Sequence, residues 1–214
     1  MSRLLRRALG HTRLYAAWKA LAHYPDYAWW RLRGRPLRAP HLVKQRAVLE
    51  YARRFRLTTL VETGTYYGEM IAATRHGFRH ICSIESDPGL AELARRRFRG
   101  FPHIEILQGD SQELVPQVLA RLAEPCLFWL DAGYYGWDEQ VGKMDRLSSE
   151  LRAILSRPYP HVILLDDAHG VDGRKGAPTL EELTAALGRD FPGRSFEVTD
   201  DILRICPLRG TYVP

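Results

Sequence analysis

Two glycines and one acidic residue have the spacing of a nucleotide-binding turn. Gly64 and Gly68 follow a short apolar run at residues 59–61 and precede a stretch with apolar groups at helical spacing. Glycine adopts positive φ without strain, so Gly64 can turn the chain sharply, and a small residue at Gly68 would let a ligand approach the backbone. Glu85 lies 21 positions after Gly64, close to the ~20 expected of an acid that binds a ribose diol. The stretch therefore predicts a nucleotide site, and the alternative is a tight turn with a solvated strand end.

A second group of acids follows two later apolar runs. Asp131 ends one run, and Asp166 and Asp167 end the next. The carboxyl ends of parallel strands meet at one edge of a sheet, so these carboxylates should lie close together, where they repel one another and lose solvent. Mg²⁺ prefers oxygen ligands, and the sequence predicts a metal on Asp131, Asp166 and Asp167. His169, or one of the aspartates, would take a proton.

Each member of this second group has a simpler interpretation. Asp167 would cap the following turn, and His169 would be an ordinary loop histidine. Asp131 would hold a substrate without a metal. The predicted catalytic residues are Asp131, Asp167 and His169, and the sequence leaves these alternatives open.

Strands and helices alternate along the chain, which places both groups at one edge of a sheet. The predicted strands are 59–61, 80–84, 103–107, 126–130, 161–165, 195–198 and 202–206. The predicted helices are 41–56, 67–76, 87–99, 110–122, 139–156 and 179–187, with Asp87, Asp110 and Thr179 as caps. Strand–helix–strand units are right-handed and build parallel sheets. The chain is therefore predicted to be α/β, with its ligands beyond the carboxyl ends of the strands.

The turn after the first strand indicates which nucleotide binds. A dinucleotide needs G-x-G-x-x-G, whose glycines admit a pyrophosphate, whereas here Tyr66 and Tyr67 crowd the loop. An acid at Glu62 suits a cationic ligand, and S-adenosylmethionine (SAM) carries an ammonium and a sulfonium without phosphate. The loop ETGTYYG resembles the first motif of the class I SAM-dependent methyltransferases, with Tyr66 in place of the usual middle glycine.

This resemblance covers roughly residues 41–207 and implies both fold and activity. It implies a Rossmann-like, seven-stranded, mostly parallel sheet of order 3-2-1-4-5-7-6 with helices on both faces. It also implies SAM as the cofactor, with an acid at Asp110 bonding the adenine amino group. The implied cofactor residues are Glu62, Gly64, Tyr66, Gly68, Glu85, Asp110, Ser111 and Asp131.

The acids after the fourth and fifth strands resemble those of Mg²⁺-dependent O-methyltransferases of the catechol and sugar-modifying types. In such enzymes the metal binds two substrate oxygens and lowers the pKa of a hydroxyl. The overall pattern is also similar to small bacterial methyltransferases. The resemblance therefore implies O-methylation of a sugar or other hydroxylated acceptor, a small molecule or a glycan.

Charge divides the chain into two unequal parts. Residues 1–38 hold nine Lys or Arg and one acid, Asp26, while the other 22 basic and 24 acidic residues give −2. We predict a basic aromatic helical extension over 1–38 and a SAM-binding domain over 39–214. Three cysteines (82, 126 and 206) sit in apolar runs and are predicted to be buried free thiols, which fits a reducing cytoplasm. No apolar run approaches the length of a membrane-spanning helix.

Three interpretations of the extension stay open. A helix over residues 1–24, ended by Pro25, would form a cap or lid on the body. A basic helix with aromatic anchors would instead lie peripherally on an anionic membrane. The charge would otherwise contact an anionic substrate; nucleic acid is not expected, because no recognisable binding module accompanies it. The sequence also leaves a homo-oligomer open.

Two rival functions remain at this stage. Tyr15-x-x-x-Lys19 mimics the catalytic pair of an NAD(P)-dependent short-chain oxidoreductase, but it precedes the nucleotide loop, whereas that family's pair follows it. The other rival is a SAM-fold protein without catalysis that acts as a binding module.

Overall fold

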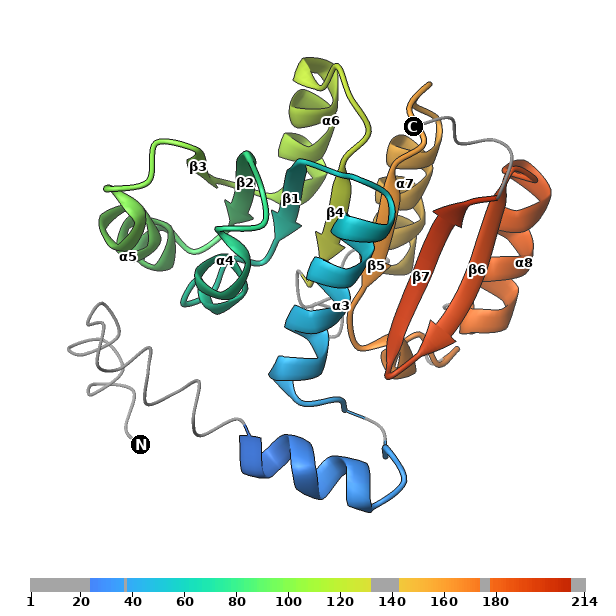
Figure 1. The fold of residues 1–214 in the computed structure, drawn as a ribbon. Helices are drawn as coiled ribbons and strands as arrows, with labels where there is room; N and C mark the ends of the chain where they lie inside the picture. The colour runs from blue at the N-terminus through green and yellow to red at the C-terminus, as the bar shows by residue number, and fades with distance from the viewer. Residues whose placement is uncertain (1–23, 37, 132–142, 174–177, 209–214) are drawn as a thin grey trace.

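A seven-stranded mixed sheet forms the centre of the molecule. The computed structural model describes residues 24–36, 38–131, 143–173 and 178–208. Its strands are β1 (Thr59–Thr63), β2 (His80–Glu85), β3 (Ile104–Gln108), β4 (Leu127–Leu130), β5 (Val162–Leu165), β6 (Arg194–Thr199) and β7 (Ile202–Pro207). Their order in the sheet is β3-β2-β1-β4-β5-β7-β6 (Figure 1). The first five are parallel, and β7 runs antiparallel to β5 and β6. The predicted fold class and strand order are confirmed.

Helices cover both faces of this sheet, as predicted. They are α3 (His41–Arg54), α4 (Glu69–Thr74), α5 (Pro88–Phe98), α6 (Ser111–Arg121), α7 (Lys143–Leu155) and α8 (Leu180–Asp190), with a 3-10 turn η1 at Ala168–Gly170. Apolar groups of α3, α4 and α5 form one core with Leu60 and Trp129. Those of α6, α7 and α8 form a second core with Val61 and Phe128. Successive strand residues thus point to opposite cores, which explains why β4 and β5 are apolar throughout.

Local signals in the sequence set the start of several helices. Asp87 accepts a hydrogen bond from the Leu90 amide, and Asp110 accepts one from the Gln112 amide. Thr179 and Glu182 form a reciprocal capping box at α8. These three caps are as predicted. The helix predicted over 67–76 is shorter, because Gly68 adopts a left-handed conformation (φ 70°) and α4 begins only after it.

The segment before α3 packs onto the body through one tryptophan. Residues 24–32 are helical, and Trp30 lies buried against Ala39 and Val43. Its indole Nε1 donates to the Pro36 carbonyl at 2.8 Å. Pro25, which was expected to end a helix, lies within this one, where the first turn tolerates a proline. The predicted helix over 1–24 and the Tyr15/Lys19 pair fall almost entirely outside the described residues.

Two further expectations concern cysteines and membrane spans. All three cysteines are buried and free, as predicted. Among the residues that the structure describes, no helix is both long and apolar enough to cross a membrane.

Candidate cofactor and catalytic site

The turn after β1 is held by backbone hydrogen bonds to β2. The amides of Gly64 and Thr65 both donate to the Ile84 carbonyl, at 2.9 and 3.3 Å. Gly64 (φ 86°) and Tyr66 (φ 49°) are both left-handed. A Cβ on Gly68 would lie 2.6 Å from Cε2 of Phe98. Glycine at position 68 is therefore required by its backbone conformation and by its packing against α5, and the ligand approach inferred from the sequence stays a prediction.

Glu85 connects this turn to the end of β2. Its Oε2 accepts from the Tyr66 amide at 2.7 Å, and its Oε1 accepts from the Asp87 amide at 2.9 Å. The side chain is thereby fixed at the carboxyl edge of the sheet. A carboxylate has about four acceptor sites, so each oxygen keeps a lone pair that can accept a bond from a ribose hydroxyl.

Glu62 lies at the end of β1 and is almost fully buried. The Ser83 hydroxyl donates to it, and Ser83 Oγ lies 2.6 Å from Thr65 Oγ1. The pKa of Glu62 is raised to about 8, mainly by burial; the bond from Ser83 lowers it, and the charges of Asp131 and Glu85 add to the rise. In the ionised form this carboxylate lacks a cationic partner among these groups, which suits a site for a positively charged ligand.

This buried acid predicts a pH effect on stability. Between its ordinary pKa of 4.5 and its folded pKa of about 8, the folded state keeps a proton that the unfolded chain has released. The contribution of Glu62 to the free energy of unfolding is therefore present at low pH and lost as the pH rises towards 8. Glu62→Gln cannot ionise and lacks this dependence. Urea unfolding of both proteins at several pH values should show wild type losing stability relative to the variant; parallel curves would show that Glu62 titrates normally.

Asp110 and Ser111 stand beside Glu85 at the end of β3. The Gly109 amide donates to the Glu85 carbonyl at 2.9 Å, which joins the two strand ends. Asp110 caps α6, and Ser111 is the first residue of that helix. The three predicted acids Glu62, Glu85 and Asp110 thus follow three neighbouring strands along one edge.

Asp166 and Asp167, at the end of β5, are paired with a lysine of α3. Lys44 Nζ lies 2.6 Å from Asp166 Oδ2 and 3.1 Å from Asp167 Oδ1. Burial lowers the pKa of Lys44, but the two aspartates outweigh this and raise it overall. The sequence analysis predicted that a metal ion would compensate the charge of these acids. In the structure, Lys44 supplies a positive charge at the predicted metal site.

Asp131 follows β4, and its pKa is affected by Lys44 and by the aspartates that Lys44 contacts. Partial burial raises its pKa to about 7, the Asp166 carboxylate adds to this, and Lys44 opposes it. The side chain keeps contact with solvent, so water screens part of the effect. Burial likewise raises the pKa of Asp166 to about 6 against the attraction of Lys44. This part of the site is therefore short of positive charge, even with Lys44 in place.

His169 is held by an aspartate from the β6–β7 turn. Its ring Nδ1 lies 2.7 Å from Asp201 Oδ2, and its amide donates to Asp201 Oδ1 at 2.9 Å. The Arg38 amide also donates to Asp201 Oδ2, at 3.1 Å. Asp201 is buried and has positive φ (62°). No sequence pattern distinguishes Asp201, because two aspartates in a hairpin turn are common for conformational reasons alone.

Asp167, His169 and Asp201 also meet the geometry of a metal-ligand group. One ligand atom from each lies within 4.8 Å of the others. Both Asp201 oxygens already accept N–H bonds, so this carboxylate is better placed to orient His169 than to bind an ion. The site predicted on Asp131, Asp166 and Asp167 stays a prediction.

Comparisons with known proteins identify the fold. No protein-family model matches the sequence, and no curated protein matches it. Among solved structures, the SAH-bound methyltransferase PaMTH1 of Podospora anserina has a TM-score of 0.58 and 18% identity, over 77% of this chain and 78% of that one. The Bacillus cereus O-methyltransferase in complex with SAH gives 0.56 and 18%, over 78% and 81%. The SAM-bound O-methyltransferase TomG of Streptomyces achromogenes gives 0.53 and 16%, over 78% and 80%.

The chain therefore has the fold of the class I SAM-dependent methyltransferases. Within that class, the similar structures include O-methyltransferases with SAM or its product SAH bound. At these identities the similarity shows the fold alone, and enzymes that share one fold can act on many different acceptors.

Proposed function

We propose that this protein is a SAM-dependent methyltransferase that transfers a methyl group to a hydroxyl of a sugar or another hydroxylated acceptor. The observation that carries the proposal is that the turn at Gly64 lies beside two acids, Glu85 and Glu62, whose surroundings differ. Glu85 is fixed by two amides, whereas Glu62 is buried without a cationic partner among the groups that shift its pKa. A ribose diol and an ammonium group are the ligand groups that these two acids fit.

The remaining cofactor residues follow from this arrangement. Glu85 would accept bonds from the ribose hydroxyls, and Glu62 would face the ammonium group of SAM. Asp110 and Ser111, at the start of α6, would bind the adenine ring. The backbone of Gly64, Tyr66 and Gly68 would form the wall of the site, and Asp131 would lie between cofactor and acceptor.

His169 is the proposed base. In the tautomer whose Nδ1–H donates to Asp201, the lone pair lies on Nε2, which can take the acceptor's hydroxyl proton. SAM, when bound, would supply the methyl group that passes from its sulfur to the acceptor oxygen, and SAH would be the second product. Asp201 acts through His169 by holding its ring, so it is a positioning residue. The proposed acceptor is a small molecule or a glycan, in the cytoplasm.

A magnesium ion is a further part of the proposal. The oxygen donors of Asp131, Asp166 and Asp167 fit Mg²⁺ by their chemistry. Burial is the main cause of the raised pKa values of Asp131 and Asp166, and a bound cation would favour the ionised form of both carboxyls. Lys44 would have to move from the two aspartates that it pairs with. When bound, the ion would lower the pKa of an acceptor hydroxyl.

Calorimetric titration with SAH tests the cofactor assignment. We expect micromolar binding in buffer containing Mg²⁺ and again in EDTA, because Glu62, Glu85 and Asp110, which would bind the cofactor, take no part in the proposed metal site. Absence of heat in both buffers would refute the proposal. NADH titrated in parallel should give no heat, and tight NADH binding would favour an oxidoreductase. Methyl transfer from labelled SAM to a panel of sugars then identifies the acceptor, and its loss in EDTA alone would support the metal.

A further inference from the structure

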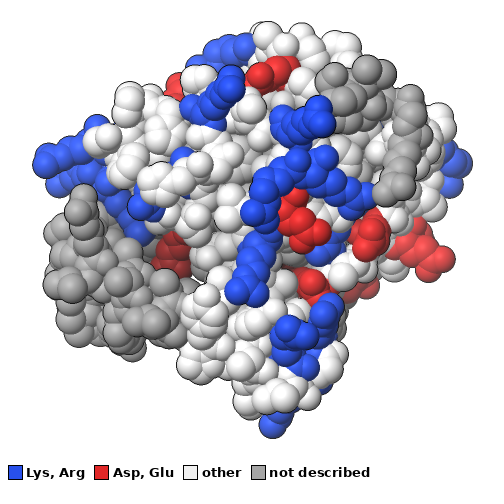
Figure 2. All heavy atoms as spheres, viewed as in Figure 1, with Lys and Arg blue, Asp and Glu red and all other residues white. Residues whose placement is uncertain are grey.

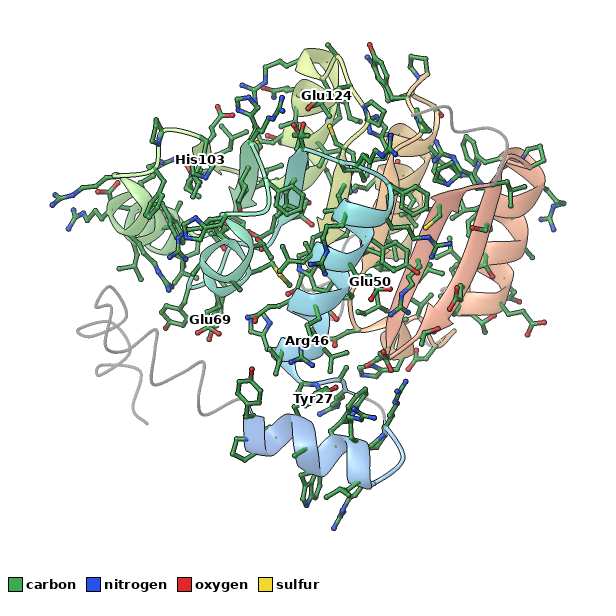
Figure 3. The ribbon with its side chains drawn as sticks, viewed as in Figure 1. Tyr27, Arg46, Glu50, Glu69, His103 and Glu124 are labelled. Carbon is green, nitrogen blue, oxygen red and sulfur yellow. The ribbon has the colours of Figure 1, made fainter. Side chains whose placement is uncertain are left out.

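The helix over residues 24–32 exposes an apolar face that points away from the protein. Tyr27 and Trp30 lie on its inner side, where Trp30 packs on Val43. Figure 3 shows Tyr27 pointing towards α3, and the Arg46 guanidinium lies 4.7 Å from the centre of its ring. At helical spacing, the opposite side carries Pro25, Ala28, Trp29 and Leu32. All four are exposed, Trp29 by 55% and Leu32 by 86%.

Positive charge surrounds this apolar face. Arg31, Arg33 and Arg35 are exposed on the helix and the turn that follows it, and residues 24–36 contain a single acid, Asp26. The Arg33 guanidinium lies 4.1 Å from the ring centre of Trp29. Figure 2 shows Lys or Arg side chains around the lobe that this segment forms at the bottom of the view. An exposed tryptophan and leucine framed by arginines is the composition of a helix that lies in a membrane interface.

The segment is also placed to meet a flat surface. It protrudes from the body beyond the start of α3 (Figure 1), and the buried Trp30 indole, bonded to the Pro36 carbonyl, fixes its orientation. An apolar tip flanked by basic side chains is the arrangement of a helix that lies in a lipid interface. The flanking arginines select negative charge.

We propose that residues 24–36 dock this protein on an anionic lipid bilayer, with Trp29 and Leu32 inserted at the interface and Arg31, Arg33 and Arg35 on the lipid headgroups. This inference goes beyond the proposed methyltransferase activity and does not depend on it. It concerns a surface that takes no part in the cofactor site.

Sedimentation with lipid vesicles tests the proposal on the full chain. The protein should sediment with phosphatidylcholine vesicles that contain phosphatidylglycerol, should stay in the supernatant with pure phosphatidylcholine, and should be released by high salt. The double variant Trp29→Ser with Leu32→Ser should bind at least about tenfold more weakly, because it loses two buried apolar side chains. The triple variant Arg31→Gln, Arg33→Gln and Arg35→Gln should lose about fivefold per arginine.

The matched control is Val198→Ser, which alters another exposed apolar residue, on β6. This variant should sediment like wild type. Thermal unfolding checks that each variant is folded, and SAH titration reports separately on the cofactor site. The proposal is overturned if wild type does not sediment with anionic vesicles, if it binds both vesicle types equally, or if the folded double variant binds as tightly as the control. The last result would show that other residues of the chain make the membrane contact.

Discussion

Replacing His169 with asparagine is expected to lower the rate of methyl transfer by about 10²–10⁴-fold, the usual contribution of a general base. The imidazole is the group that the Asp201 carboxylate orients at the end of β5, and asparagine cannot take the hydroxyl proton. The KM for SAM and the affinity for SAH should change little, because neither depends on that proton. Steady-state kinetics with the acceptor identified by the screen, and SAH calorimetry, measure the two effects separately.

Two controls separate the chemistry of His169 from its packing. His76→Asn changes an exposed histidine after α4 and should leave the rate unchanged. Asp201→Asn keeps the shape of the side chain but weakens the hold on the ring, so it should lower kcat and alter the pH–rate profile while SAH affinity stays the same. A His169→Asn protein with full activity would show that another group takes the proton.

Replacing Glu85 with alanine is expected to weaken SAH binding by about 1–3 kcal/mol, or roughly 5- to 150-fold. The lost carboxylate would bind the ribose, and it also fixes the turn through the amides of Tyr66 and Asp87. Glu85→Gln keeps one acceptor oxygen and should fall between alanine and wild type. Calorimetry at one salt concentration gives the three dissociation constants.

The matched control for this prediction is Glu92→Ala on α5. Glu92 is exposed and pairs with Arg96 at 2.8 Å, so its loss should not affect the cofactor. Unchanged SAH affinity in a folded Glu85→Ala protein would rule out the ribose assignment. A similar loss in Glu92→Ala would instead point to a general effect of net charge.

Most helix starts were predictable because they depend on short-range signals, whereas the strand order was predicted from a family resemblance. Asp87, Asp110 and Thr179 each cap a helix within three residues of their own position. The central strands are apolar on both faces, and a resemblance in one loop supplied their order. Because the acids follow the ends of parallel strands, they could be placed on one edge of the sheet without any side-chain contact being known.

The contacts that tune the candidate site were not predictable, because their partners lie far apart in the sequence. Lys44 and Asp166 are 122 residues apart, and Arg38 and Asp201 are 163 residues apart. Helical periodicity placed Lys44 on a polar face of α3 but did not show that this face meets the end of β5. An aspartate such as Asp201 is common in a hairpin turn, so nothing in the sequence indicated that it would bond to His169.

The buried cysteines make this protein a convenient background for site-specific labelling. The chain has three cysteines, all buried, and burial raises the pKa of Cys82 and Cys126 to about 12 and that of Cys206 to about 11. Maleimide reagents react with the thiolate, so the native thiols should react slowly while the protein is folded. A single cysteine introduced on an exposed helix would then carry a fluorophore without removal of any core residue, and its emission would report the polarity of whatever surface that helix meets.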